Sequence, residues 1–491
     1  MNPMQAAMKT KAILVVLFVL AHAAWAHADW PTAHGTPDNA GLARVDTRAA
    51  DTPSAVVDVG QVAPGANPVI GPDGTLYIGN LAGELVALHP DGTPYWRRKL
   101  NPEHGSIFAS SAVGADGSIY VVSTMSYLDH RSGTPVSIHT AFLHKFLAGG
   151  AWAFSKTFPK ATLYPFTDGG ASTAPPNIWR WNGTEAIMVP VVYKALGRSE
   201  LRIIAFSTGG VVLGDKRVTV QVYDINGTTT TFLQGIIDSF VDCITNGPIC
   251  LIPDFGGPPL PGGVPDAGWP QPGVAIWESG QGSPYVWVAD SIRSTVAYKF
   301  DPTTGFVEIY RSTDATERLS SPPVALENLV AVVGTDENAL VCLKFERENS
   351  LVCPSGGPIT AAPTRLFDGR LVAIGRDGTM SIIEGRSLVL QQRLNGGSIA
   401  SAAASCTHLF VSSNRELVTF DVTSMMPVAR FPWTGGGRHA PIIGPSGQIY
   451  AMTKFGLFVF APPPTLPFLT FAGPRQALCN IPIVTGTVTL P

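Results

Sequence analysis

Short apolar runs alternate with glycine-containing turns along most of the chain, as residues 67–100 illustrate. There the runs PVI, TLYIGN, ELVALH and TPYWRRKL are separated by GPDG, LAG and PDG. Apolar residues at every second position, as at Leu76 and Ile78 or at Leu85 and Ala87, are typical of half-buried strands. In the turns, Asp-Gly supplies the positive φ that a tight hairpin needs. The pattern predicts a four-stranded antiparallel sheet.

The same unit recurs seven more times, which is the strongest signal in the chain. Pro323, Pro363, Ala402 and Pro441 occupy equivalent places and are 40, 39 and 39 residues apart. This spacing is close to the about 40–45 residues of a four-stranded propeller blade. A sheet of this size cannot bury both faces alone, so neighbouring units must pack in a closed ring. The other units begin at Ser110, Thr173, Pro272, Ser320, Thr360, Ile399 and Arg438.

The last unit has only three strands before the sequence APPP at residues 461–464. A fourth strand is available in SAVVDVGQV, residues 54–62, which has no partner within its own repeat. We therefore predict an all-β fold, an eight-bladed β-propeller over residues 29–462 whose last blade is closed by this N-terminal strand. A seven-bladed ring is the alternative if the irregular third or fourth unit is not a blade.

The N-terminus has the features of a secretory signal peptide over residues 1–28. Lys9 and Lys11 precede an apolar stretch, and small-residue A-x-A sites follow at residues 24–28. The alternative is an uncleaved anchor, but the apolar stretch is short for a membrane span. The first cysteine is Cys243, so no N-terminal cysteine can carry a lipid. We expect an exported protein, periplasmic or extracellular, with no membrane span and no lipid anchor.

Composition supports a turn-dense β protein and argues against nucleic-acid binding. Charged residues make up 14 % of the chain, and it contains 51 glycines and 42 prolines. Average soluble proteins have roughly 25 % charged residues. The net charge is −3 and no basic run occurs, so the electrostatic footprint of a nucleic-acid-binding protein is missing.

Six cysteines, all in the second half of the chain, indicate disulfides because the number is even and the chain has an export signal. The first two flank the turn sequence ITNGP, and the next two flank two expected strands joined by a charged turn. The last two remain as a third pair, for which free buried thiols are the alternative. The predicted pairs are Cys243 with Cys250, Cys342 with Cys353, and Cys406 with Cys479.

The chain resembles β-propellers built from quinoprotein-type (PQQ-like) repeats. The resemblance rests on DWPTAHGTPDNAG at residues 29–41, on P-x-x-x-x-D-G-x-x-Y at Pro68–Tyr77, and on G-x-L-x-A-L-x-x-D-G-x-x-x-W at Gly83–Trp96. It covers most of residues 29–462 and implies the propeller fold. It implies little about activity, because one fold hosts many functions.

Two branches of this family imply different functions. Quinoprotein dehydrogenases hold the quinone and a calcium ion near the pore, and typically carry adjacent cysteines or a C-x-x-C-H haem motif, both of which this sequence lacks. The tryptophan that ties blade to blade in the family is present at Trp96 but missing from the fourth, sixth and eighth units. The other branch is similar to a lipid-anchored scaffold of outer-membrane assembly, which has no chemistry of its own. We therefore predict no cofactor, with PQQ and calcium as the alternative.

The first strand of each blade should line the central channel, where most aligned positions are small. The exceptions are Gln271 and His439, with Arg438 beside the histidine. Histidine titrates near neutral pH and arginine can clamp an anion, so these three residues predict an anionic ligand site at the pore mouth. The alternative is a pair that bonds loop carbonyls. The small positions are Ser110, Thr173, Ser321, Ala361 and Ala400.

Other polar groups are interpreted as structural. The aspartates of the repeated Asp-Gly pairs are turn residues. His130, His139 and His144 lie close in sequence, but the last two point to opposite faces of an expected strand, so no metal site is predicted. No G-x-S-x-G motif and no phosphate-binding glycine loop occurs, so catalytic residues remain unknown.

The largest departure from the repeat is an insertion at residues 215–271, where proline and glycine argue against regular strands. It would gate the pore, present Trp269 to a protein partner, or serve as a linker.

Residues 463–491 form a C-terminal tail. We interpret the chain as a monomeric binding or scaffold protein that acts on an unknown protein or small molecule through its pore mouth or this insertion. The alternative is a pore-centred enzyme, either a PQQ-dependent dehydrogenase or a lyase or hydrolase that uses Arg438 and His439.

Overall fold

The structure is a computed structural model of the chain. Its described residues are 30–462, except for 102–103, 130–135, 164–165, 173, 196–197, 223–258, 261–263, 266–272, 278–282, 290–294, 313–318, 327–329, 336–338, 345–350, 355–356, 386 and 455. Every element within these ranges is a β-strand. None of the described residues forms a helix with the length and apolar character that a membrane crossing needs.

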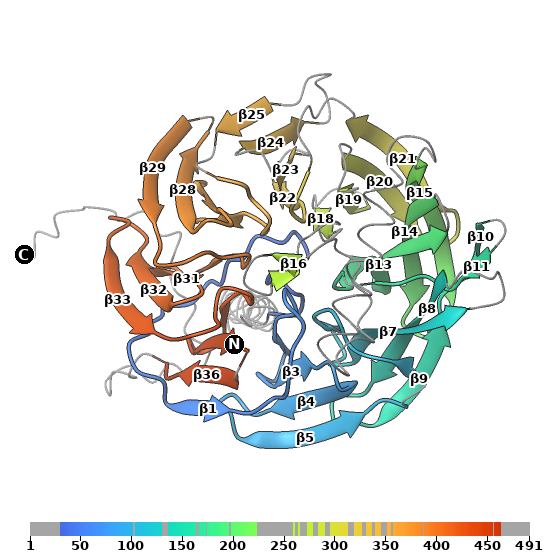
Figure 1. Cartoon of the computed structure of the whole chain (residues 1–491), viewed down its shortest axis with the longest axis horizontal. Coiled ribbons are helices and arrows are strands. Elements are labelled where there is room, and N and C mark those ends of the chain that lie inside the picture. The colour runs from blue at the N-terminus through green and yellow to red at the C-terminus, as the bar shows by residue number, and fades with distance from the viewer. Residues whose placement is uncertain are drawn as a thin grey trace, which may run out of the picture.

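Eight four-stranded antiparallel sheets surround a central axis, so the predicted eight-bladed propeller is confirmed (Figure 1). In blades 1 to 7 the chain starts at the strand nearest the axis and moves outward. Blade 1 contains β2 (Val69–Ile70), β3 (Leu76–Gly79), β4 (Glu84–Leu88) and β5 (Pro94–Lys99). Blade 2 contains β6 (Ala112–Val113), β7 (Ile119–Asp129), β8 (Val136–Phe146) and β9 (Trp152–Thr157). Blade 3 contains β12 (Asn177–Trp181), β13 (Thr184–Ala195), β14 (Arg198–Ser207) and β15 (Val212–Val222).

The remaining blades repeat this order. Blade 4 contains β18 (Val274–Trp277), β19 (Tyr285–Ala289), β20 (Thr295–Asp301) and β21 (Gly305–Ser312). Blade 5 contains β22 (Val324–Leu326), β23 (Val330–Gly334), β24 (Ala339–Lys344) and β25 (Leu351–Pro354). Blade 6 contains β26 (Thr364–Arg365), β27 (Leu371–Ile374), β28 (Thr379–Glu384) and β29 (Ser387–Arg393). Blade 7 contains β30 (Ala403–Ala404), β31 (His408–Ser412), β32 (Glu416–Asp421) and β33 (Pro427–Pro432).

Blade 8 is closed by a strand from the other end of the propeller sequence, as predicted. It contains β34 (Ile442–Ile443), β35 (Ile449–Thr453), β36 (Gly456–Phe460) and the outermost strand β1 (Ala55–Val57). β1 pairs antiparallel with β36, with Ala55 opposite Val459 and Val57 opposite Leu457. The ring is therefore closed by hydrogen bonds between segments about 400 residues apart in sequence.

Two short strand pairs lie outside the blades, and one of them corrects an expectation. β10 (Ala161–Leu163) pairs with β11 (Phe166–Asp168) between blades 2 and 3. β16 (Pro259–Leu260) pairs with β17 (Val264–Pro265), although proline and glycine argued against regular strands in this segment. β15 also extends to Val222 because it follows the long strand β14 to its start at Arg198. Residues 215–222 therefore belong to blade 3 and not to the insertion.

The Asp-Gly pairs are turn residues, as the sequence suggested. Gly74 has a φ of +82°, and Asp73 accepts hydrogen bonds from the backbone N–H of Thr75 (3.0 Å) and from its hydroxyl (2.9 Å). A carboxylate used in this way satisfies the turn backbone and has no catalytic role.

Blades dock on one another through an outer-strand side chain that meets a glycine in the next blade. Trp96 donates from Nε1 to the Ala148 carbonyl of blade 2 (3.3 Å), and a Cβ on Gly150 would lie 2.6 Å from its ring. Phe154 of β9 makes the corresponding contact with Gly210 of blade 3. Phenylalanine thus takes the place of the docking tryptophan between blades 2 and 3.

The cysteines are only partly described. Cys406 is disulfide-bonded to a partner outside the described side chains, so its pairing with Cys479 remains a prediction. In blade 5, Cys342 is opposite Leu351 and Cys353 is opposite Leu340, which places the two cysteines diagonally across β24 and β25. Their side chains lie outside the described part of the chain, so the bond between these two cysteines remains a prediction. Cys243, Cys250 and Cys479 lie outside the described residues.

Candidate functional site at the propeller axis

The segment that precedes β1 runs through the centre of the ring, where it appears as the dark blue trace in Figure 1. We call residues 30–47 the axial segment. Its carbonyls accept one backbone hydrogen bond from the innermost strand of most blades. These bonds run from Ile70 to Trp30 (2.8 Å), Val113 to Pro31 (2.9 Å), Ile276 to Pro37 (2.7 Å), Ala325 to Asp38 (2.9 Å), Arg365 to Ala40 (2.9 Å) and Ala404 to Gly41 (2.8 Å).

This arrangement follows from the needs of the innermost strands. The inner edge of each first strand carries N–H groups that no neighbouring strand reaches, and a buried N–H without a partner is costly. The axial segment provides those partners for blades 1, 2 and 4 to 7 in chain order. Ser110, Ala361 and Ala400 are buried, so they do not border an open pore mouth.

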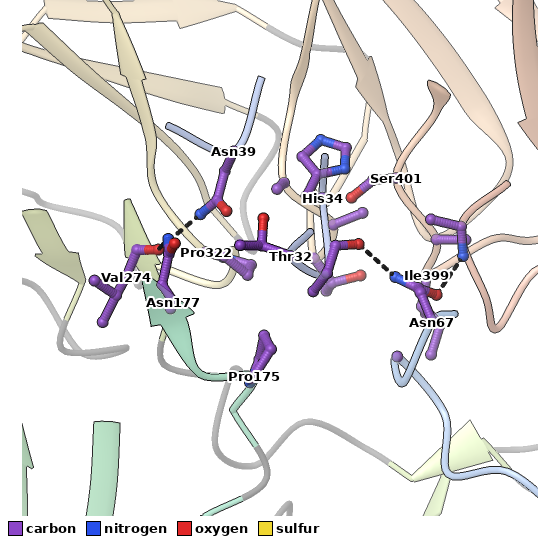
Figure 2. A pocket seen from close by; sticks show the side chains of 18 of the residues that line it. Thr32, His34, Asn39, Asn67, Pro175, Asn177, Val274, Pro322, Ile399 and Ser401 are labelled. Atoms are coloured by element: carbon purple, nitrogen blue, oxygen red, sulfur yellow. Dashed lines mark hydrogen bonds between the residues drawn. The ribbon is translucent and has the colours of Figure 1, made fainter. Parts of the chain in front are cut away.

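Side-chain amides complete the attachment at blades 3 to 5 (Figure 2). Asn177 donates from Nδ2 to the carbonyls of Pro37 (2.8 Å) and Val274 (2.7 Å). Asn39 donates to the carbonyls of Val274 (3.0 Å) and Pro323 (2.9 Å). Asn39 has a φ of +61°, a conformation that asparagine tolerates better than most residues. One amide therefore links the axial segment to two blades.

A cavity of about 60 Å³ remains between the axial segment and the loops that lead into the innermost strands. Its lining includes His34, Asn67 and Ser401 (Figure 2). Thr360 and Arg438 also line it. Arg438 is the single charged side chain among the described residues that line it. Burial lowers the pKa of Arg438, because partial removal from water disfavours its charge.

The predicted pair Arg438 and His439 does not form a joint pore-mouth site. His439 is 1 % exposed, and its Nδ1 donates to the Ala66 carbonyl (2.8 Å). Burial, with a smaller effect from Arg438, lowers the pKa of His439 to about 4. His439 thus has the role of bonding a loop carbonyl, which the sequence left as the alternative, while Arg438 lines the cavity.

Three other predicted positions lie outside the described residues: Gln271, the partner-binding candidate Trp269, and Thr173. The prediction that Gln271 and Trp269 bind a ligand or partner is therefore untested.

The histidines of blade 2 have structural partners. His144 is buried, with Nε2 2.8 Å from Ser123 Oγ and Nδ1 2.6 Å from Ser155 Oγ. Burial lowers its pKa to about 3, so the ring is neutral near pH 7. His139 is also buried, and His130 lies outside the described residues. Within the described chain, no group of three His, Cys, Asp or Glu side chains is placed to hold a metal ion.

Sequence reasoning missed the axial segment itself. Residues 29–41 were informative only as a family motif, although their prolines, glycines, threonines and asparagine exclude a regular strand or helix. Near a closed ring, such a segment is a candidate for filling the axis. His34, Asn39 and Asn67 follow from that placement and have no motif of their own.

The class that the fold defines is the eight-bladed β-propeller. No protein-family model matches the chain, and no curated protein matches it either. Similar solved structures include BamB from Moraxella catarrhalis, which is 14 % identical with a TM-score of 0.39 over 73 % of this chain and 82 % of that chain. The computationally designed protein Ika8 is 8 % identical, with a TM-score of 0.46 over 84 % and 98 %. U3-55K is 11 % identical, with a TM-score of 0.44 over 85 % and 100 %.

Proposed function

We propose that the chain is an exported binding or scaffold protein and not a pore-centred enzyme. The observation that carries this proposal is the occupied axis. Propellers offer their axis as a site for substrates and cofactors, and here the axial segment takes that space and leaves a cavity of about 60 Å³. Pockets that bury a drug-sized ligand are about 300–1,000 Å³.

A quinone cofactor does not fit the residues at the axis. A tricyclic quinone needs a pocket of the size given above, and the inner-strand N–H groups that border the axis are already bonded to the axial segment. His439 is buried against the Ala66 carbonyl, so it does not form an acid–base pair with Arg438. These contacts support the binding role over the alternative of a PQQ-dependent dehydrogenase, lyase or hydrolase.

The proposed partner surface lies on the outer parts of blades 1 and 2, where exposed aromatic and apolar side chains occur. Tyr95, Leu147 and Trp152 are 47 %, 48 % and 62 % exposed. Trp96 and Arg98 connect this surface across the blade boundary, since Arg98 Nε donates to the Gly150 carbonyl (2.9 Å). Tryptophan, tyrosine and arginine are the residues most enriched at the centre of protein interfaces. We call these five residues the rim patch.

The rim patch favours recognition through side chains over the addition of a strand. Both outer strands carry a bulge. In β5 it lies opposite the step from Ala87 to Leu88 of β4, and in β9 it lies opposite the step from Lys145 to Phe146 of β8. Bulges at a sheet edge twist the strand and discourage pairing with another strand. A partner would therefore contact the exposed aromatic groups and arginine.

The test is capture of partners from an extract of the exported fraction by the purified mature protein. Tyr95→Ser combined with Trp152→Ser should abolish specific capture, and Val307→Ser should not. Val307 is a matched control because it is 53 % exposed on the outer strand of blade 4. Retention of every captured partner by the rim-patch variant would place the interface elsewhere, with the insertion and Trp269 as the next candidates.

A calorimetric titration with pyrroloquinoline quinone, with and without calcium, tests the alternative directly. We expect no saturable heat. Saturable binding that weakens in Arg438→Ala would overturn the scaffold proposal in favour of a quinoprotein enzyme.

A further inference from the structure

The rim patch contains an arginine whose side chain is held in place while its charge is left unbalanced. Arg98 Nε donates to the Gly150 carbonyl of blade 2 (2.9 Å), and Nη1 donates to the Arg97 carbonyl (3.2 Å). The guanidinium carbon lies 5.8 Å from the centroid of the Trp96 ring. These three partners are uncharged, and no carboxylate among the described residues pairs with Arg98. The Nη2 donors and the positive charge therefore remain for a group from another molecule.

The surroundings of Arg98 also favour negative charge. The adjacent Arg97 differs from it, because Nη1 of Arg97 lies 3.2 Å from Oε2 of Glu84 in the same blade. β5 and β9 follow one another along the outer edge of the ring (Figure 1). They contain two further cations, Lys99 and Lys156, and no acidic residue. An acidic partner is complementary in charge to these two strands.

The hairpin that Arg98 contacts also carries the apolar part of the rim patch. The Gly150 N–H donates to the Leu147 carbonyl and the Leu147 N–H donates to the Ala151 carbonyl, both at 2.8 Å. This tight turn presents the exposed side chain of Leu147 and leads directly into the exposed Trp152. A group bound to Arg98 thus has exposed apolar side chains from the same turn next to it.

The indole N–H of Trp152 is already used within blade 2. Trp152 Nε1 donates to Ser155 Oγ (3.1 Å), which is 2.6 Å from Nδ1 of the buried His144. On the other side of that ring, Ser123 Oγ donates to the His104 carbonyl (2.6 Å) and so accepts from Nε2 of His144 (2.8 Å). Nδ1 of His144 therefore accepts from Ser155, and every donor of the chain is used. Trp152 offers its ring, and not its N–H group, to a partner.

We propose that the rim patch recognises an acidic segment of a protein partner. A carboxylate of this segment accepts hydrogen bonds from Arg98, and a neighbouring apolar side chain packs on Leu147 and Trp152. Arg98 is the specificity-determining residue, because a planar guanidinium presents its donors in the geometry of a carboxylate. The inference rests on the proposed binding function and adds the chemistry of the partner.

The experiment selects binders from a random peptide display library on the full-length mature protein. We expect enrichment of Asp or Glu next to an apolar residue. A synthetic peptide of the selected sequence is then compared, by fluorescence anisotropy, with a twin in which the matching amide replaces the acid. The acidic peptide should bind saturably and more weakly as ionic strength rises, and the amide twin should bind about tenfold more weakly.

Two variants of β5 assign the contact. Arg98→Gln should weaken binding of the acidic peptide about tenfold, because a charge-assisted hydrogen bond is lost. Arg97→Gln removes the same charge from the adjacent position and should change the affinity by less than about threefold. Thermal denaturation of both variants checks that the fold is intact.

The proposal is overturned if the selection enriches no acidic residue, or if the acidic peptide and its amide twin bind equally well. It is also overturned if Arg98→Gln binds the acidic peptide like the parent protein, or if Arg97→Gln loses as much affinity as Arg98→Gln. These measurements use no natural partner, so they fail or succeed separately from the capture of partners from the extract.

Discussion

The innermost and outermost strands of the same blades differ in burial and in the source of their hydrogen bonds. β2, β6, β30 and β34 are fully buried, whereas five of the six residues of β5 are exposed. The inner strands of blades 1, 2 and 4 to 7 are bonded to the axial segment, and the outer strands of blades 1 and 2 are bulged. The difference separates a hub that holds the ring together from a rim that is free to contact partners.

The hub and the rim also use different side chains. The hub combines small residues with buried amides and histidines, because backbones approach closely there and every polar group needs a partner. The rim uses aromatic side chains that are partly exposed, such as Tyr95 and Trp152. Substitutions at the hub should therefore change stability, and substitutions of exposed rim residues should change binding alone.

The largest expected effect is the response of the hub to acid. Burial lowers the pKa of both His34 and His439 to about 4, whereas an unfolded histidine titrates near 6.5. The unfolded state therefore binds more protons between pH 6.5 and pH 4. The stability that the neutral rings contribute is present above pH 6.5 and is lost as the pH falls towards 4. At pH 5 each ring should account for about 2 kcal/mol, or about 4 kcal/mol together.

Urea denaturation at pH 7 and pH 5 measures this loss together with that of buried His144 in blade 2, whose pKa is also lowered. A variant of one hub histidine isolates the contribution of that ring. His439→Gln keeps a donor for the Ala66 carbonyl but cannot titrate, so it should reduce the difference between the two pH values by about 2 kcal/mol. The aspartates with lowered pKa, such as Asp91 and Asp421, titrate below pH 4 and do not contribute in this window. An unchanged pH dependence in the variant would show that His439 is not responsible.

The second prediction concerns the close approach of Gly41 to His34 at the hub. Gly41 has a φ of +65°, and a Cβ there would lie 2.5 Å from Cε1 and 2.7 Å from Nε2 of the buried His34 ring. Gly41→Ala should cost about 3 kcal/mol, from backbone strain and from displacement of the ring.

Gly183→Ala separates these two causes. Gly183 has a φ of +75° and nothing within 4 Å of a built Cβ, so it should lose only about 1 kcal/mol, the part that comes from backbone strain. Urea denaturation of both variants gives the comparison. Equal losses would mean that the ring of His34 moves aside freely and that the hub is loosely packed.

The sequence predicted the rim and the blades better than the hub, for a physical reason. Strand alternation and a spacing of 39 to 40 residues are visible in one dimension, so the eight blades, the turn role of Asp73 and the closing strand were all foreseen. The axial segment is held by its backbone carbonyls, which carry no side-chain signal. Its role, and the cavity beside His34 and Thr360, could only be found once the ring had been assembled.

The same limit explains the partial success at Arg438 and His439. Both residues stand out among small neighbours in the aligned repeats, and Arg438 does line the cavity. Which of two adjacent side chains faces the axis depends on the local path of the chain, and alignment of repeats does not resolve it. The outer boundary of blade 3 was misplaced for a related reason, because the length of β15 is set by its neighbour β14.

The smallest predicted effect compares two tryptophans of the rim patch. Trp96 is half-buried, packs 5.8 Å from the ring of Tyr77 and docks blade 1 on blade 2. Trp152 is 62 % exposed. Trp96→Ala should cost about 2 kcal/mol, less than the 3–5 kcal/mol of a fully buried tryptophan, and Trp152→Ala should cost less than about 0.5 kcal/mol. Comparable losses of stability for the two variants would mean that Trp152 also has a structural role, and the rim patch would then lose its most exposed binding group.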